Sequence, residues 1–245
     1  MLAHKHLPQN EKGRDFFFTD LHGTYSTLQI ALDEVNFDPA ADRLISGGDL
    51  IDRGPGNVDA LNLLTEPWFH SVAGNHEQLM IDAVLHDRNE LLWLHNGGTW
   101  AAYVDIDELK SLARLVDNKT SFTLTLETSY GPVGISHAEP PQNFTWSNIS
   151  NLTEDELVHF LWARTCVEGD IPLNTKGVVS TFHGHTVVNR PKQLGNAFFL
   201  DTGSVRKDKG GYLTFFCIHD ANKPYSCFPT PPRLTHPSSP STSQN

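Results

Sequence analysis

The first half of the chain alternates short apolar runs with segments of helical spacing. Three apolar, β-favouring runs predict buried strands at 14–19, 44–47 and 69–73. Apolar residues at helical spacing predict helices up to about 36, at 57–64, at 77–94 and at 105–116. A strand end therefore precedes each of the first three helices, and polar residues follow each of those strand ends.

The second half of the chain is richer in strands. Residues 121–128 alternate with a period of two, which predicts a half-buried strand that returns at 133–136. A capping box at Thr153–Glu156 opens a helix, and further strands are expected at 178–182, 198–200 and 212–217. We therefore expect an α/β (α+β) fold in which two packed mixed β-sheets form a central sandwich flanked by helices.

The domain organisation follows from length and local composition. At 245 residues, one domain over 1–228 is the default. Residues 1–13 are polar and are expected to form a loose N-terminus. Residues 229–245 are rich in Pro, Ser and Thr, which predicts a disordered tail.

Charge and cysteine usage narrow the class of protein. A net charge of -11 argues against nucleic acid and anionic membranes as main partners. The three cysteines form no CxxC motif, which is typical of a reducing compartment. No apolar run reaches the length of a membrane span, and no secretory leader pattern opens the chain. We expect a cytoplasmic protein, and the sequence leaves its oligomeric state open.

Polar residues of one chemical kind follow five of the predicted strands. They are Asp20 and His22, Asp49 with Asp52 and Arg53, Asn75 and His76, His137, and His185. Hard oxygens and imidazoles suit divalent first-row metals, and the absence of thiolates argues against a structural zinc site. A carboxylate shared by two ions is a common way to hold metals for displacement at phosphorus. Two dications with two Asp ligands keep a surplus positive charge that attracts phosphate.

Arg164 follows from helical spacing alone. After the capping box, Leu157, Phe160 and Leu161 lie on one apolar face, and Arg164 is seven residues after Leu157. A guanidinium on an inward face requires an anion, so we expect Arg164 to bind phosphate.

The ordered motifs resemble those of calcineurin-like metallophosphoesterases, and in particular the phosphoprotein phosphatase family. Its signature runs Asp-x-His-Gly, Gly-Asp-x-x-Asp-Arg-Gly and Gly-Asn-His-Glu, followed by two later histidines, and all five parts occur here in order. The segments at 96–100 and 136–140 are closer to the small bacterial and phage branch, typified by bacteriophage lambda protein phosphatase. The resemblance covers roughly residues 14–205.

This resemblance implies a role for each residue of the set. Two divalent ions are implied, manganese being expected and iron or zinc being alternatives. A hydroxide that bridges the ions would attack phosphorus directly. His76 would protonate the leaving alkoxide, oriented by Asp52, while Arg53 and Arg164 would hold the phosphoryl oxygens. The implied metal ligands are Asp20, His22 and the bridging Asp49 for the first ion, and Asp49, Asn75, His137 and His185 for the second.

Three functions are compatible with these motifs. The first is a phosphatase acting on phosphoserine and phosphothreonine, with phosphotyrosine possible, in protein substrates. The second is a symmetrical dinucleoside tetraphosphate hydrolase, a related family that typically lacks the acidic residue found here at Asp52. The third is a non-catalytic phosphoprotein-binding pseudophosphatase, which predicts a lost ligand or acid. Because none is lost, the residues favour the phosphatase.

Other polar and aromatic residues have simpler interpretations. We expect His183, two residues before His185, to be structural. Asp201 is expected to form a turn or to support the metal ligands from behind. Phe144 and Trp146 are either anchors of the 139–151 loop or a wall that faces the substrate.

Overall fold

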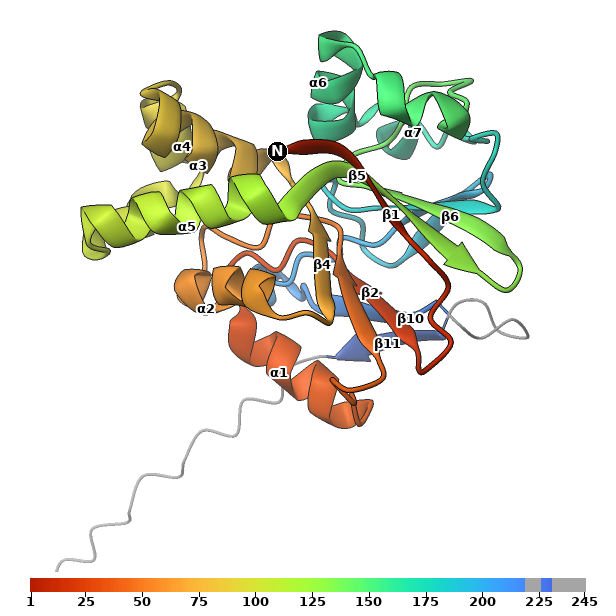
Figure 1. Ribbon diagram of the computed structural model, residues 1–245, viewed down its shortest axis with the longest axis horizontal. Helices are drawn as coiled ribbons and strands as arrows, with labels where there is room; N and C mark the ends of the chain where they lie inside the picture. Colours follow the sequence, from red (N-terminus) through yellow and green to blue (C-terminus); the bar gives the residue numbers. More distant parts are fainter. Residues whose placement is uncertain (219–225, 231–245) are drawn as a thin grey trace, which may run out of the picture.

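The computed structural model describes residues 1–218 and 226–230, and its strands form one curled mixed sheet (Figure 1). Within these residues the order is β11-β10-β2-β3-β4-β5-β6-β7-β9-β8, with β1 paired to β5. The strands are β1 Leu2–Leu7, β2 Asp15–Phe18, β3 Arg43–Ser46, β4 Phe69–Val72, β5 Thr120–Thr128, β6 Gly131–Ser136, β7 Ser180–His183, β8 Lys192–Leu194, β9 Ala197–Phe199, β10 Leu213–Cys217 and β11 Ser226–Thr230.

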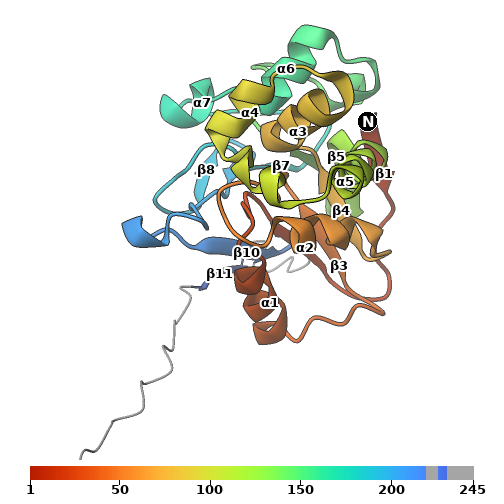
Figure 2. The ribbon, with the colours of Figure 1, turned by 90° about the vertical axis from the view of Figure 1, so that its left-hand side faces the viewer.

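Helices cover the sheet and lie toward opposite ends of the molecule. Helices α1 and α2 lie at the end away from α6 and α7 (Figures 1 and 2). The α-helices are α1 Tyr25–Glu34, α2 Asn57–Asn62, α3 Asn75–His86, α4 Glu90–Asn96, α5 Ile106–Lys119, α6 Glu154–Trp162 and α7 Thr165–Glu168. The described residues also form short 3-10 helices at η1 Leu63–Thr65, η2 Gly98–Tyr103, η3 Trp146–Asn151 and η4 Lys207–Lys209.

The central strands are apolar on both faces because both faces are buried. In β2, Phe16 and Phe18 pack into a cluster with the helices, whereas Phe17 faces a second cluster inside the curl. The ring of Phe17 lies 5.5 Å from that of Phe182 on β7, and Phe182 lies 5.4 Å from Phe216 on β10. The predicted sandwich of two mixed layers is therefore present, and the long strand β5 connects its halves into a continuous sheet.

The N-terminus is more ordered than its polar composition predicts. Residues 2–7 form β1, parallel to β5, so the expectation of a loose segment over 1–13 is wrong for these residues. Strand β4 pairs with β5 only at Thr120 and Ser121, which leaves most of that edge of β5 for β1. His4 Nδ1 lies 3.0 Å from Thr123 Oγ1, and His6 pairs with Glu127 at 2.9 Å. Polar residues suit this strand because Leu7 is the one buried residue among its six.

The single helix predicted over 77–94 is divided in two. Asp87 and Asn89 adopt left-handed backbone, with φ of 52° and 58°. The Asp82 carboxylate accepts hydrogen bonds from the side chains of Arg88 and Asn89, each at 2.9 Å. These bonds stabilise a sharp break between α3 and α4, which turns α4 back toward the strand ends.

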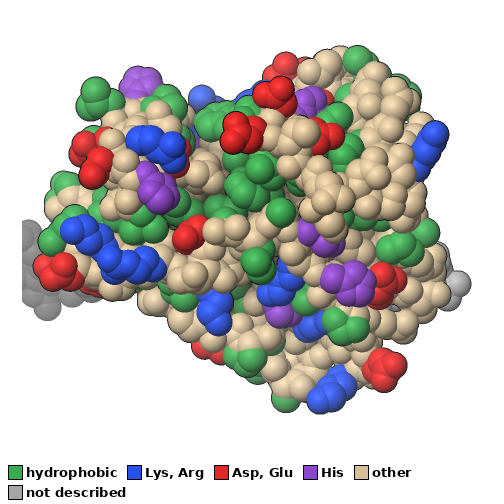
Figure 3. Space-filling model, turned by 45° about the horizontal axis from the view of Figure 1, so that its top comes forward, with side chains coloured by type: hydrophobic (Ala, Val, Ile, Leu, Met, Phe, Trp, Pro, Cys, Tyr) green, Lys and Arg blue, Asp and Glu red, His purple; other side chains and the backbone are tan. Residues whose placement is uncertain are grey.

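Charged side chains are mixed over the surface that Figure 3 shows. Blue Lys and Arg side chains are interspersed with red Asp and Glu side chains, and hydrophobic side chains lie between them. Among the described residues, no helix is both long enough and apolar enough to cross a membrane. The tail predicted over 229–245 lies outside the described residues, except for residues 229 and 230 at the end of β11.

Candidate active site

The predicted site residues meet at the carboxyl ends of β2, β3, β4, β6 and β7. Six of them have left-handed backbone, with φ between 47° and 78°. Such conformations are uncommon outside glycine, and they concentrate where surrounding structure enforces them. These six residues are Asp20, His22, Asp49, Asp52, Arg53 and His185.

Hydrogen bonds between neighbouring loops hold these backbones in place. Asp20 N donates to Gly48 O at 3.0 Å, and His22 N donates to Asp49 O at 2.9 Å. The Glu77 carboxylate accepts from the backbone N–H groups of Asp49, Leu50 and Gly74 at 2.7–2.8 Å. Glu77 thereby ties the end of β3 to the start of α3.

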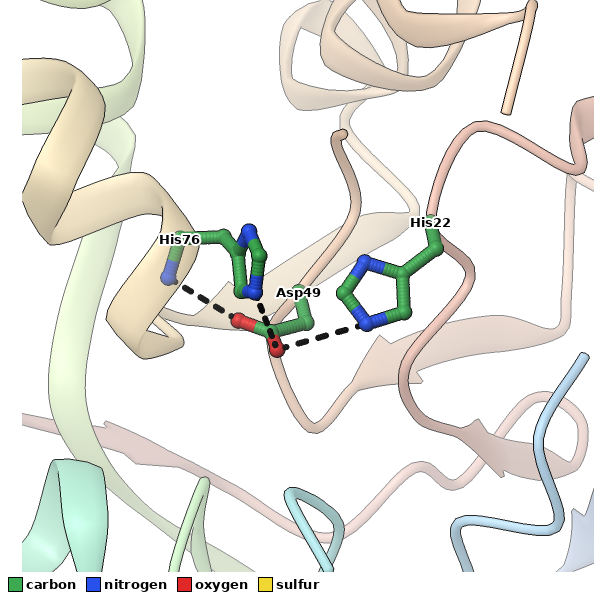
Figure 4. Close-up of side chains that lie close together, drawn as sticks. All are labelled: His22, Asp49 and His76. Carbon is green, nitrogen blue, oxygen red and sulfur yellow. Dashed lines mark hydrogen bonds and ion pairs between the residues drawn. The ribbon is translucent and has the colours of Figure 1, made fainter. Parts of the chain in front are cut away.

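Asp49 lies at the centre of the site. Its Oδ2 atom is 3.5 Å from His137 Nε2, 3.6 Å from His22 Nε2 and 3.8 Å from His76 Nε2. Figure 4 shows His22 and His76 approaching this carboxylate from two sides. Burial alone would raise the pKa of Asp49, but the surrounding imidazoles of His137, His76, His22 and His185 lower it below its usual value.

Two of the histidines have defined lone-pair directions. His22 Nδ1 lies 2.8 Å from Ile51 O, and His137 Nδ1 lies 2.8 Å from Gly47 O. A carbonyl oxygen can only accept, so both Nδ1 atoms carry the proton and a neutral ring directs its Nε2 lone pair into the site. Burial lowers the pKa of His22 to about 3, which keeps that ring neutral at pH 7.

The geometry fits two divalent ions that share one carboxylate. His22, Asp49 and His76 form one group of ligand atoms within 4.8 Å of one another, and Asp49, His137 and His185 form another. Asp49 belongs to both groups, which is the arrangement expected of a dinuclear site. The first group contains His76 where the resemblance implies Asp20, so the individual ligand assignments stay predictions.

The second group brings acceptors close together. His137 Nε2 lies 3.0 Å from Asn75 Oδ1 and 3.1 Å from His185 Nδ1. Burial and the charge of His137 lower the pKa of His185 to about 3. Lone pairs that face one another in a buried site are stabilised by a cation between them, so this cluster fits a metal ion.

Asp20 lies beside the cluster and is held from several directions. Its carboxylate accepts from the backbone N–H of His185 at 2.9 Å and from Thr19 Oγ1 at 2.6 Å. Burial and the neighbouring charge of Asp49 raise the pKa of Asp20 to about 8. Two buried carboxylates at close range favour a bound cation, which lowers the cost of ionising both.

His76 and Asp52 form a buried pair. His76 Nδ1 donates to Asp52 Oδ2 at 2.5 Å, and both side chains are almost fully buried. Burial alone would lower the pKa of His76, but Asp49 and Asp52 together raise it above its usual value. Arg53 Nη2 lies 2.9 Å from Nε2 of His76, and Arg53 Nη1 lies 2.5 Å from Nε2 of His22. Arg53 therefore lies directly beside the candidate acid and a candidate ligand.

An open cavity of about 290 Å³ covers this cluster, and Arg164 lines it together with Arg53 and Arg206. The argument that placed Arg164 on an apolar helical face is wrong, because α6 ends at Trp162. Arg164 instead has φ of -139° outside the helix, and it is exposed at the cavity wall. Arg164 therefore lies near the site as predicted, but it does so from the segment between α6 and α7.

The structure also shows where the other residues considered in the sequence lie. Phe144 and Trp146 are buried with Ile149 and Phe160, so they anchor the loop and do not face the cavity. His183 is buried between Ser136 and Thr181, as expected of a structural residue. Asp201 accepts from Gly203 N at 2.8 Å and thus forms a turn beside the cavity.

Sequence reasoning missed several residues of the site. Glu77 ends the Gly-Asn-His-Glu motif, but no local pattern indicates that its carboxylate binds three backbone N–H groups. Trp93 and Trp100 donate to Asp52 from a distant part of the chain. Arg206 follows β9 and lines the cavity, where the chain carries no motif that indicates it.

Comparison with known proteins decides the family. A family model described as calcineurin-like phosphoesterase matches residues 16–198, which is more than half of the chain. The chain belongs to this family. Serine/threonine-protein phosphatase 1 of Salmonella typhimurium is 34% identical to it over 202 residues, covering 80% of this chain and 87% of that protein. Serine/threonine-protein phosphatase 2 of Escherichia coli is 32% identical over 207 residues, covering 81% and 90%.

Solved structures agree at the level of the fold. A serine/threonine phosphatase from Saccharomyces cerevisiae superimposes with a TM-score of 0.67, covering 97% of this chain and 86% of that chain. At 12% sequence identity this likeness concerns the fold alone. The predicted metallophosphoesterase fold and the resemblance to protein phosphatases are confirmed, and the metal-dependent phosphatase class agrees with these relatives.

The nucleotide-hydrolase alternative has narrower support. A symmetrical bis(5'-nucleosyl)-tetraphosphatase of Sodalis glossinidius is 41% identical, but over only 64 residues and 25% of this chain. The protein phosphatases match about three times that length. The shared part is thus a fraction of the chain, whereas the phosphatase similarity extends over most of it.

Proposed function

We propose that the chain is a dinuclear-metal phosphomonoester hydrolase that dephosphorylates phosphoserine and phosphothreonine in proteins. The observation that carries this proposal is the pairing of His76 with Asp52 next to two ligand groups that share Asp49. An alkoxide is a poor leaving group and needs a proton, so a positioned acid beside a dinuclear site suits phosphoserine. The similarity to bacterial protein phosphatases, which covers 80–81% of this chain, supports the same substrate class.

The chain would hold its metal ions through residues from both halves of the sheet. Asp20, His22 and Asp49 are proposed for one ion, and Asp49, Asn75, His137 and His185 for the other. Manganese is the ion we propose, because open sites of oxygen and imidazole ligands suit it, and iron and zinc are the alternatives. When bound, the ions supply Lewis acidity and a nucleophile at neutral pH.

The arginines would bind and orient the phosphoryl group. Arg53 already contacts the Nε2 atoms of His22 and His76, so its guanidinium lies where phosphoryl oxygens would be held. Arg164 approaches from the exposed wall of the same cavity. Guanidinium groups bind phosphate oxygens through paired, charge-assisted hydrogen bonds, which fix the orientation of the phosphoryl group.

Proton transfer would come from the buried pair. Asp52 binds Nδ1 of His76, which leaves Nε2 as the atom that faces the cavity and Asp49. Asp49 and Asp52 raise the pKa of His76, so the protonated ring persists to higher pH. His76 would then donate its Nε2 proton to the serine or threonine oxygen as the ester bond breaks.

The partner proposed is a phosphorylated protein, and the compartment proposed is the cytoplasm. The wide spacing and odd number of cysteines support a reducing compartment.

The test is phosphate release from phosphoserine, phosphothreonine and phosphotyrosine peptides by purified protein with Mn²⁺. We expect turnover on the first two peptides, its loss with a chelator, and its return when Mn²⁺ is restored. No turnover on any phosphopeptide after metal reconstitution would contradict the proposal.

A further inference from the structure

The carboxylate of Asp52 has more partners than the acid pair requires. His76 Nδ1 donates to its Oδ2 at 2.5 Å, and Trp100 Nε1 donates to its Oδ1 at 2.7 Å. Trp93 Nε1 lies 3.2 Å from Oδ1 and 3.1 Å from Oδ2. Asp52 itself is fully buried. Three donors therefore fix both oxygens of one buried anion.

Both tryptophans reach Asp52 because the chain turns sharply between them. Trp93 lies on α4 and Trp100 on η2, and the connection at 96–98 has Gly97 at φ of 121°. A Cβ on Gly97 would lie 2.8 Å from Arg53 Cγ, and one on Gly98 would lie 2.6 Å from the Trp93 ring. The two glycines thus permit the close approach that brings both indole N–H groups to one carboxylate.

The chemistry of indole makes these contacts directional. An indole N–H can only donate, so neither tryptophan can take a proton from His76 or supply one to the reaction. Among the described residues, His76 is the ion-pair partner of Asp52, and the indoles add neutral donors only. Neutral donors satisfy the buried anion without a second cation that would compete for it.

The rings also support one another. Their centroids lie 6.2 Å apart at an interplanar angle of 89°, a favourable edge-to-face arrangement. Trp93 is buried in the helical core cluster, whereas Trp100 packs against that cluster while half-buried. Packing limits the motion of both indoles, and this in turn limits the motion of the Asp52 carboxylate that they bind.

We propose that Trp93 and Trp100 form an indole clamp that positions Asp52 and, through it, the His76 ring for proton donation to the leaving group. This inference rests on the proposed phosphatase function. Trp93 and Trp100 are positioning residues, since neither is among the residues that line the cavity. They give the 96–100 segment a role that its sequence alone did not.

The first test replaces each indole by a ring that cannot donate. Trp100→Phe and Trp93→Phe should each lower kcat on a phosphoserine peptide by about tenfold or more, since a hydrogen bond to a charged group is lost. On p-nitrophenyl phosphate, whose leaving group needs no proton, the loss should stay below about twofold. Equal losses on both substrates would overturn the positioning role.

A matched control removes another buried indole N–H. Trp146 donates to Thr125 Oγ1 at 2.7 Å. It is far from Asp52 in the sequence, and it is buried with Phe144 and Phe160. Trp146→Phe should leave the ratio of the two kcat values unchanged. A shift in that ratio as large as that of Trp100→Phe would show that the effect is general destabilisation.

A double-mutant cycle asks whether the clamp acts through Asp52. In an Asp52→Asn background, Trp100→Phe should cause no further change in the kcat ratio, because the carboxylate that it positions is gone. An undiminished effect in that background would overturn the proposal. If Trp100→Phe does not fold, Trp93→Phe supplies the same cycle.

A spectroscopic readout is independent of turnover. The chain has five tryptophans, so a ¹H–¹⁵N spectrum should contain five indole N–H signals. Asp52→Asn should shift two of them strongly, those absent from the spectra of Trp93→Phe and Trp100→Phe. Unshifted signals would overturn the clamp. An inactive wild-type protein whose two signals still shift would contradict the proposed function and retain the clamp.

Discussion

The buried floor of the cavity and its exposed wall are built in different ways. Asp49 and His137 on the floor are buried and tied by several hydrogen bonds. Arg164 and Arg206 on the wall are exposed, and no side-chain hydrogen bond or ion pair is assigned to either within the described part of the chain. The difference indicates a division of labour, in which fixed groups perform the chemistry and adjustable cations select the substrate.

Physical costs explain why the two regions differ. Groups fixed before substrate arrives lose no further freedom during the reaction, which favours a rigid floor for catalysis. Exposed arginines lose rotamer freedom only when an anion binds them, so they can adapt to different peptides. Changes to the floor should therefore reduce kcat, whereas changes to the wall should raise KM.

The largest expected effect comes from the shared carboxylate. Asp49→Asn removes the ligand common to both groups, so the several kcal/mol that each ion contributes would be lost together, which corresponds to about 10⁴-fold or more in kcat. Metal content by mass spectrometry should fall in parallel. Asp33→Asn on α1 is the control, and full metal content in Asp49→Asn would contradict the shared role.

The acid on the floor should have the next largest effect. His76→Asn is expected to lower kcat on a phosphoserine peptide by about 10²–10⁴-fold, the usual contribution of a general acid. Hydrolysis of p-nitrophenyl phosphate should be much less affected, because nitrophenolate leaves without a proton. Unchanged kcat on the phosphoserine peptide would show that another group protonates the alkoxide.

On the wall, Arg164→Ala should change binding more than turnover. Loss of an exposed guanidinium that binds phosphate is expected to raise KM roughly tenfold, with kcat nearly unchanged. Arg114→Ala, an exposed arginine on α5, supplies the matched control. A fall in kcat at constant KM would show that Arg164 contributes to the chemical step, as the floor residues do, and would contradict the proposed division.

A small stability effect is expected beneath the floor. Burial lowers the pKa of His183 to about 3, below its usual value of 6.5, so the unfolded chain binds more protons between these values. Stability contributed by the neutral ring is present above pH 6.5 and is lost as the pH falls toward 3. Between pH 7 and pH 6 the free energy of unfolding should fall by less than about 1 kcal/mol from this source.

Urea unfolding of chelated protein measures this effect. His183→Asn, which cannot titrate, should lose less stability than the wild type over the same pH interval. An equal loss in both proteins would show that His183 does not contribute to the acid sensitivity.

The sequence predicted those features that depend on local pattern. Apolar runs located β2, β3 and β4, and polar residues after them located the site, which the motif resemblance then divided into roles. Strand β1 was missed because its residues other than Leu7 are exposed or half-buried, which allows the segment to be polar. The break between α3 and α4 depends on left-handed Asp87 and Asn89, which helical spacing does not reveal.

Contacts between residues far apart in the chain could not be predicted from the sequence. Trp100 and Asp52 are 48 residues apart, and only the folded arrangement of α3, α4 and η2 brings them together. The position of Arg164 was predicted from a helix that ends two residues earlier. Local periodicity therefore located the elements, whereas tertiary contacts decide which side chains support the chemistry.

The most direct test of the central claim compares two substrates with one preparation of Mn²⁺-loaded protein. The account predicts that kcat/KM for a phosphoserine peptide exceeds that for diadenosine tetraphosphate, and that Asp52→Asn reduces the peptide reaction. Preferential hydrolysis of the tetraphosphate, unaffected by Asp52→Asn, would contradict the assignment as a protein phosphatase.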